Sequence, residues 1–258
     1  MPLSADTALL EVSEVTKVFG GLVAVDGVTF TIRRGQIAAI IGPNCAGKTT
    51  LFNLISGSLQ PSRGDLWFRQ RKLTGLAPQK VASLGIARTF QTVRLFNNLS
   101  VLDNVLIGAH TRGKAGIVRS AIRFPSTDEE EQHILEIAMD KLAWVGLENR
   151  TSDLARNLAY GQQKKLEIAR ALASEPALLL LDEPAGGLNA SEKDQLASLI
   201  YAARDQGVTI VIVEHDMNMV MKISDWIIVL NYGVKIAEGL PREVQSNQEV
   251  ITAYLGLG

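Results

Sequence analysis

One short stretch constrains this chain more than any other, because it satisfies the pattern G-x-x-x-x-G-K-[ST]: Gly42-Pro43-Asn44-Cys45-Ala46-Gly47-Lys48-Thr49. It follows the apolar run Gln36–Ile41 and precedes a helical stretch, Lys48–Ser56. In a strand, tight loop and helix of this order, backbone N–H groups turn inward and the helix N-terminus adds its positive end. The sequence therefore predicts that Gly42–Thr50 binds a polyphosphate. Lys48 would reach the phosphates and the Thr49 hydroxyl would ligate Mg²⁺.

Other apolar runs predict the rest of the core. Ala177–Leu181 and Val208–Val213 are almost continuous in aliphatic residues, as parallel strands covered on both faces tend to be. Helical stretches follow them, at Ser191–Gln206 and Asp216–Ile223. This alternation indicates an α/β core with a parallel sheet.

Two further regions differ from that core. Leu9–Phe19 and Val23–Arg33 alternate around Gly20-Gly21, which predicts an antiparallel hairpin beside the main sheet. The middle of the chain is helical and has no good strand; its stretches are Val101–His110, Glu129–Val145 and Tyr160–Ala173. We therefore expect residues 1–90 to form the first part of the core with the antiparallel β subdomain, 91–157 an inserted helical subdomain, and 158–258 the remainder.

Composition excludes several classes of protein. The chain has 258 residues, of which 47% are hydrophobic and 21% charged, as in an ordinary globular protein. Its net charge is −1, so it lacks the overall positive charge that would indicate a nucleic-acid partner. The single cysteine, Cys45, excludes an internal disulfide and fits a reducing compartment. Met1–Glu11 lacks the pattern of a signal peptide, and the apolar runs are too short to cross a bilayer. Any link to a membrane is expected to be a partner protein.

Polar residues at the ends of the predicted strands supply the second half of a phosphate site. Asp182 and Glu183 follow Ala177–Leu181, so Asp182 can hold Mg²⁺ through water and Glu183 can take a proton from an attacking water. His215 follows Val208–Val213 and Glu214 at the same edge, where ligands collect in α/β sheets.

With these residues in view, the chain resembles the ABC ATPases over nearly its whole length. Leu158-Ala159-Tyr160-Gly161-Gln162 resembles the LSGGQ signature, and Gln91, after Arg88-Thr89-Phe90, resembles the Q-loop. Gly187-Leu188-Asn189 resembles the D-loop, and His215 the switch histidine. The fold this implies is α/β: a P-loop NTPase (RecA-like) core with an antiparallel β subdomain and an inserted α-helical subdomain.

The resemblance also implies roles for residues. ATP would bind with Phe19 stacked on adenine and Val25 beside it, and with its phosphates on Gly42–Thr50. Lys48, Gln91, Glu183 and His215 would serve hydrolysis. Mg²⁺ would be held by Thr49, Gln91 and Asp182. Leu158–Gln162 would meet the nucleotide of a second ATP-binding subunit, identical or paralogous, so each chain carries half of each site.

Finer likeness points to the ATP-binding subunits of branched-chain amino acid importers, and to the longer of the two paralogues. It rests on Phe19–Val25, Ala87–Gln91, Leu158–Arg170, Ala185–Asn189 and Val250–Gly256. The implied partners are permease subunits and, indirectly, a solute-binding protein, with the chain peripheral on the cytoplasmic side of the cell membrane. The basic residues Arg112, Lys114, Arg119 and Arg123 form either a solvated loop or a contact to a partner or lipid headgroup.

Two residues depart from the commonest family pattern. Cys45 stands where glycine is usual; a left-handed backbone there would cost about 1–2 kcal/mol, and we expect weakened ATP binding. Its thiol, near Lys48 and a helix N-terminus, is expected to be reactive, and ATP should block its maleimide labelling. Ala159 replaces a serine whose hydroxyl would bond the γ-phosphate, a loss of about 1.5–3 kcal/mol. These departures leave a binding-impaired cassette as one alternative. A soluble ABC ATPase acting on nucleic acid or ribosomes is another.

Overall fold

The computed structural model describes residues 8–110 and 128–255, with side chains described through 110 and over 131–254. Residues 111–124 of the basic stretch therefore lie outside the described residues, and so does Gly256.

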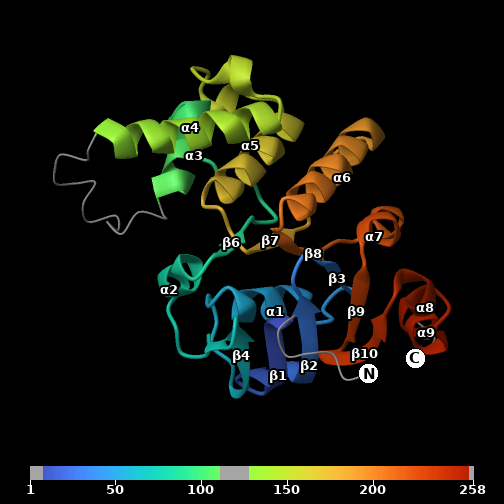
Figure 1. The fold of residues 1–258 in the computed structure, drawn as a ribbon. Coiled ribbons are helices and arrows are strands. Elements are labelled where there is room, and N and C mark those ends of the chain that lie inside the picture. The colour runs from blue at the N-terminus through green and yellow to red at the C-terminus, as the bar shows by residue number, and fades with distance from the viewer. Residues whose placement is uncertain (1–7, 111–127, 256–258) are drawn as a thin grey trace.

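A six-stranded sheet forms the centre of the molecule, in the order β10-β9-β3-β8-β7-β6 (Figure 1). All neighbours in it are parallel except β9 and β10, which pair antiparallel. Its strands are β3 (Ile37–Ile41), β6 (Ile86–Arg88), β7 (Leu178–Asp182), β8 (Thr209–Val213), β9 (Trp226–Asn231) and β10 (Val234–Gly239). Every residue of β3, β7 and β8 is buried, because both faces of the sheet are covered.

A second, antiparallel sheet lies against this one, in the order β2-β1-β4-β5. Its strands are β1 (Ala8–Phe19), β2 (Leu22–Arg33), β4 (Arg63–Phe68) and β5 (Arg71–Lys72). The turn at Gly20-Gly21 joins β1 and β2, and Gly20 has a positive φ of 57°.

Helices complete the fold. They are α1 (Lys48–Ile55), α2 (Pro78–Ser83), α3 (Val101–His110), α4 (Asp128–Trp144), α5 (Tyr160–Ala173), α6 (Ala190–Asp205), α7 (Met217–Ile223), α8 (Pro241–Gln245) and α9 (Gln248–Leu255), with short 3₁₀ turns at Glu148–Arg150 and Ala155–Asn157. Helices α3, α4 and α5 group at one end of the molecule, and β1, β2 and β4 lie at the other (Figure 1).

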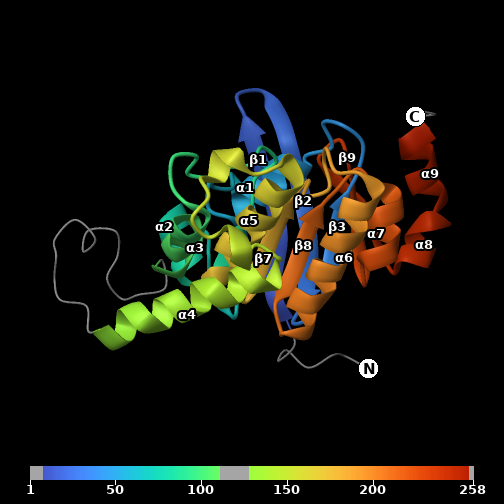
Figure 2. The same cartoon turned by 90° about the horizontal axis from the view of Figure 1, so that it is seen from above.

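Three apolar clusters hold these layers together. Side chains of β3 alternate: Ala38 and Ile40 face a cluster shared with α1 and the antiparallel sheet, whereas Ile37, Ala39 and Ile41 face one shared with α6 and α7. Helices α6 and α7 cover the same face of the sheet (Figure 2). A third cluster joins α3, α4 and α5. Because α5 contributes Ile168 and Leu172 to the sheet's cluster as well, it connects the helical group to the core.

The predicted strands, hairpin and helices are all present, with ends that differ by a few residues. The predicted strand Gln36–Ile41, for example, begins at Ile37. Strands β4, β5, β6, β9 and β10 and helices α2, α8 and α9 were not predicted. Among the described residues, no helix has both the length and the apolar character needed to span a bilayer.

Candidate functional site

The phosphate loop lies between the buried strand β3 and helix α1. Its glycines are required by close packing: a Cβ on Gly42 would lie 2.1 Å from the carbonyl oxygen of Leu230, and one on Gly47 would lie 2.5 Å from that of Ala24. Gly47 is also the N-cap of α1, with a φ of 97° and no side-chain cap. The first N–H groups of α1 therefore have no capping side chain, which suits an anion.

The turn between β9 and β10 supports this loop from the side. Gly233 donates from its N–H to the carbonyl of Ala46 at 3.1 Å, and its own carbonyl accepts from the N–H of Asp26 at 2.8 Å. The position of the loop thus depends on a turn almost two hundred residues away in sequence.

Lys48 lies across the loop. Its ammonium donates hydrogen bonds to the carbonyl oxygens of Gly42 and Pro43, both at 2.7 Å. Burial lowers the pKa of Lys48, and the nearby Glu183 and Cys45 partly raise it. An ammonium has three donors, so one remains for an anion held by the loop. The neighbouring Thr49 is exposed, as a metal-ligating hydroxyl would need to be.

Three of the predicted catalytic side chains meet at the carboxyl ends of β7 and β8. Gln91 Nε2 donates to Glu183 Oε2 at 2.8 Å, and His215 Nε2 lies 2.8 Å from Glu183 Oε1. Glu183 itself has a φ of 47°, and its N–H donates to the carbonyl of Val213 on β8. The structure therefore brings Gln91, Glu183 and His215 together from three separate segments.

Asp182, the last residue of β7, has a partner that sequence reasoning missed. Arg88 Nη2 donates to Asp182 Oδ2 at 2.8 Å, and both side chains are almost fully buried. The same guanidinium donates to Asn53 Oδ1 at 2.6 Å and Ser56 Oγ at 3.0 Å, both at α1. Arg88 thus ties the strand that ends in Asp182 to the helix that follows the phosphate loop.

The donor set also fits a magnesium ion bound with phosphates. Among the described residues, no cluster of three or more His, Cys, Asp or Glu could hold a metal. Magnesium is commonly bound by one or two carboxylates, water and substrate phosphates. Asp182 keeps Oδ1 without a hydrogen bond to another described residue, and such an oxygen can meet a metal-bound water.

One of the two predicted adenine contacts, Val25, lies beside the phosphate loop. Val25 is fully buried, and one of its methyl groups would lie 3.5 Å from a Cβ on Gly47. Phe19, at the end of β1, is 43% exposed, and the ammonium of Lys17 lies 5.0 Å from its ring centre. An exposed aromatic ring is suited to stacking on a base.

The predicted signature segment begins α5. Leu158 is buried, Ala159 is the N-cap, and the Gln162 side chain accepts from the N–H of Ala159 at 3.2 Å. Tyr160 is 45% exposed. In the described part of the chain, no hydrogen bond or ion pair joins 158–162 to 42–50. The structure therefore does not bring these two predicted nucleotide-binding segments into one site within the chain.

Two other residues near the site were missed from sequence. Glu214 is buried and accepts from the N–H groups of Ala185, at 2.6 Å, and His215, at 3.0 Å, so it fixes the start of the segment that carries His215. Lys164 is buried near Gln91 and Glu183. The sequence did hold a signal for Glu214, because this residue directly follows an apolar strand and precedes His215.

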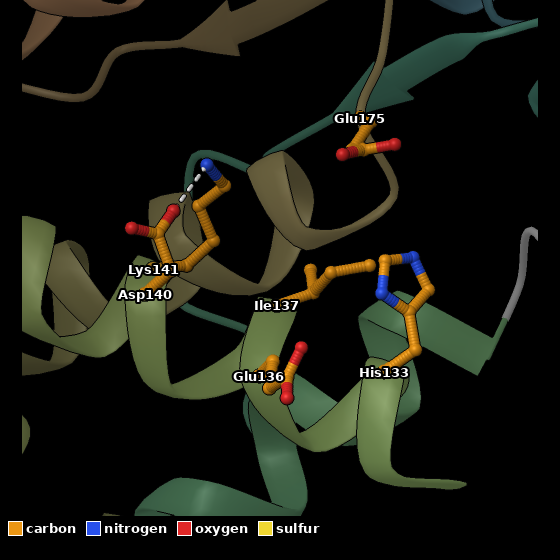
Figure 3. Close-up of a pocket in the computed structure, with 6 residues that line it drawn as sticks. All are labelled: His133, Glu136, Ile137, Asp140, Lys141 and Glu175. Atoms are coloured by element: carbon orange, nitrogen blue, oxygen red, sulfur yellow. Dashed lines mark hydrogen bonds and ion pairs between the residues drawn. The ribbon is translucent and has the colours of Figure 1, made fainter. Parts of the chain in front are cut away.

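A hollow elsewhere on the surface does not belong to this site. It measures about 230 Å³ and is lined by His133, Glu136, Ile137, Asp140, Lys141 and Glu175 (Figure 3). All of these come from α4 except Glu175, which follows α5. None of the predicted site residues lines this hollow.

Comparison with known proteins agrees with this geometry. The family described as "ABC transporter" matches residues 25–186, and the family described as "Branched-chain amino acid ATP-binding cassette transporter" matches residues 234–257. The chain is 43% identical to the high-affinity branched-chain amino acid transport ATP-binding protein LivG of Salmonella typhimurium, over 96% of this chain and 98% of that protein.

Solved structures agree as well. The ADP conformation of an ATP-binding cassette of an ABC transporter superposes with a TM-score of 0.84 at 31% identity, covering 96% of this chain and 99% of the other. A dimeric bacterial ABC transporter cassette superposes with a TM-score of 0.77 at 27% identity, covering 91% and 99%.

Proposed function

This chain belongs to the ABC transporter family of ATP-binding cassettes, and we propose that it hydrolyses ATP to drive an importer of branched-chain amino acids. The substrate class is supported by LivG and by the family that matches residues 234–257. The near-complete coverage of both chains supports a role for the whole chain like that of the relative.

The observation that carries the catalytic part is the meeting of Gln91, Glu183 and His215 at the edge of the sheet next to the phosphate loop. We assign Glu183 the role of accepting a proton from the attacking water, because its carboxylate lies at the centre of the three. His215 and Gln91, each 2.8 Å from that carboxylate, orient it. Lys48 neutralises phosphate charge.

Residues around the loop would hold the nucleotide and its metal. Gly42–Thr50 would bind the phosphates, and Phe19 with Val25 the adenine. Thr49, Gln91 and Asp182 would hold Mg²⁺, which when bound supplies positive charge to the phosphates. Arg88 keeps one oxygen of Asp182 engaged and leaves the other for that role.

The rest of the assembly follows from the signature segment. Because no hydrogen bond or ion pair among the described residues joins Leu158–Gln162 to this chain's own phosphate loop, we propose that this segment completes the site of a second cassette. The dimeric relative supports this arrangement. Homodimer and heterodimer both fit. The further partners are permease subunits and, through them, a solute-binding protein, with the chain on the cytoplasmic face of the membrane. No nucleic-acid partner is proposed.

Substitution of Glu183 by Gln tests the catalytic assignment. We expect kcat for ATP hydrolysis to fall by about 10²- to 10⁴-fold, because the base is lost while the phosphate loop is intact. ATP binding, measured by equilibrium dialysis, should persist. Glu148→Gln is the matched control, since Glu148 is exposed and lies in the 3₁₀ turn that follows α4.

Each outcome discriminates between functions. Wild-type hydrolysis by Glu183→Gln would show that the base is misassigned. No hydrolysis by the wild type, alone or in its native membrane complex, would favour the binding-impaired cassette. Purification of that complex identifies its permeases, and stimulation of its ATPase by leucine, isoleucine or valine with the binding protein tests the substrate class.

A further inference from the structure

Lys164 is a buried cation with an unusual set of partners. It lies on α5, one turn after Tyr160, and is only 3% exposed. Its ammonium donates to the carbonyl oxygens of Gln91 at 3.1 Å and of Glu183 at 3.3 Å. Its contacts therefore go to the backbone of two predicted catalytic residues.

Because the ammonium of Lys164 is buried, it depends on the partners that the protein supplies. A charge removed from water must find good partners or it is strongly disfavoured. Two carbonyl oxygens from separate segments partly supply them, together with the ring of Tyr160, whose centre lies 5.7 Å from the ammonium. Gln91 and Glu183 are thus held at a fixed position relative to α5.

The backbone of Glu183 needs such support. Its φ of 47° lies in the left-handed region, which a residue with a side chain seldom adopts without restraint from its surroundings. Its N–H is held by the carbonyl of Val213, and its carbonyl is held by Lys164. The direction of the Glu183 side chain depends on both contacts, because a change in φ would turn it away from His215.

A second contact from the same helix acts on the segment around Gln91. Glu167, one turn further along α5, is buried and accepts from the N–H groups of Phe90 at 3.4 Å and Arg94 at 3.2 Å. Lys164 and Glu167 together hold the segment from Phe90 to Arg94 against α5. Any displacement of this helix is therefore passed to Gln91.

We propose that Lys164 is a positioning residue for ATP hydrolysis, which fixes the backbones of Gln91 and Glu183 relative to the start of α5. This inference rests on the proposed function, in which Leu158–Gln162 meets the nucleotide of the second cassette. Contact at that segment then sets the geometry of this chain's own hydrolytic residues through the ammonium of Lys164. Binding of ATP at the site of the second cassette therefore positions Gln91 and Glu183 in the site of this chain.

The test compares Lys164→Met, Lys164→Arg and Lys165→Met in the full-length chain. Lys165 is the matched control, because it lies on the same helix but bonds to Gln195 on α6. For Lys164→Met we expect kcat for ATP to fall by up to about 100-fold, as for a misplaced catalytic group, with KM nearly unchanged. Lys164→Arg should retain more activity than Lys164→Met, and Lys165→Met should match the wild type.

A second readout separates positioning from folding. In the Glu183→Gln background, Lys164→Met should leave the affinity for ATP unchanged, because the phosphate loop is intact. Thermal unfolding identifies a variant that fails to fold, and Lys164→Gln, which keeps a donor at this position, then replaces Lys164→Met in the kinetic comparison.

The outcomes distinguish this inference from the proposed function. If the wild type hydrolyses ATP and Glu183→Gln does not, while folded Lys164→Met has the wild-type kcat, the inference fails and the function stands. An equal loss in Lys164→Met and Lys165→Met, or a loss confined to KM, also overturns it. If the wild type itself does not hydrolyse ATP, the proposed function fails first.

Discussion

At the scale of single residues, the site is built from strained backbones and buried charges. Glu183 and Cys45 both have positive φ, 47° and 65°, although neither is glycine. Arg88 and Asp182 form an ion pair away from water. Loss of one member of such a pair leaves an uncompensated charge, so each depends on the other. Cys45 belongs to the phosphate loop itself, and Glu183 and Asp182 lie at the end of β7.

Cys45 carries the first prediction at this scale. The sequence predicts that its side chain weakens ATP binding if the backbone is left-handed. The structure has that backbone, with a φ of 65° at Cys45, so the strain belongs to the folded chain. We expect Cys45→Gly to raise the free energy of unfolding by up to about 1 kcal/mol, the strain relieved less the chain entropy that glycine adds.

Urea unfolding of the wild type and Cys45→Gly, with ATP affinity measured on both, checks this expectation. Cys45→Ala is the control, since alanine keeps the Cβ and hence the strain. An unchanged stability accompanied by a tighter affinity for ATP would contradict this expectation and would support the prediction from sequence that Cys45 weakens ATP binding.

At the scale of elements, α5 and α6 differ in how their first turns are capped. Asn189 caps α6 fully: its side chain accepts from the N–H of Glu192 at 3.0 Å, and the Glu192 carboxylate accepts from the N–H of Asn189 at 2.9 Å. Ala159 at the start of α5 has only the return bond from Gln162. The signature helix therefore begins with a weaker cap.

Adding a capping side chain to α5 and removing the one on α6 should change the free energy of unfolding in opposite directions. We expect Ala159→Ser to raise the free energy of unfolding by about 1 kcal/mol, and Asn189→Ala to lower it by about the same amount, because each adds or removes one hydrogen bond to an orphan N–H. Thermal or urea unfolding measures both. A destabilised Ala159→Ser variant would show that the cap geometry at α5 cannot accept a hydroxyl.

At the scale of the whole molecule, the helical group and the sheet meet through α5. Glu167 lies at that junction, buried, with Arg170 3.9 Å away. Burial raises the pKa of Glu167 above its ordinary 4.5, an effect that the N–H of Arg94 and the charge of Arg170 only partly oppose. The charged form is thus less stable in the folded chain than in the unfolded one.

This shift predicts a pH dependence of stability. A carboxyl with a raised folded pKa contributes stability that is complete below pH 4.5 and lost as pH rises through the folded pKa. Glu167→Gln has no such charge, and its amide oxygen can still accept from Phe90 and Arg94. We therefore expect the stability of Glu167→Gln relative to the wild type to increase from pH 4.5 toward neutrality.

Urea unfolding over this pH range measures that difference. Glu148→Gln serves as the control, because an exposed carboxyl should give a difference that does not vary with pH. A relative stability of Glu167→Gln that falls with rising pH would mean that the ion pair with Arg170 outweighs the cost of burial.

The sequence by itself determined the strand, loop and helix of the phosphate site. It also determined the succession of aliphatic strands and the polar residues that end them. These are local features, because each is carried by residues that are adjacent in sequence. An aliphatic run of strand length predicts a buried strand, and G-x-x-x-x-G-K-[ST] predicts a phosphate-binding loop. The short strands β5 and β6 were missed because two or three residues carry no period of their own.

Only the tertiary structure decided how these segments meet. The bonds from Arg88 to Asp182, from Gln91 to Glu183 and from Lys164 to both catalytic backbones join segments far apart in the chain. Such pairings depend on strand order and on the crossing of α5 over the sheet, and no spacing along the chain encodes them. The backbone conformation at Cys45 was likewise open from the sequence, and the structure shows it to be left-handed, with a φ of 65°.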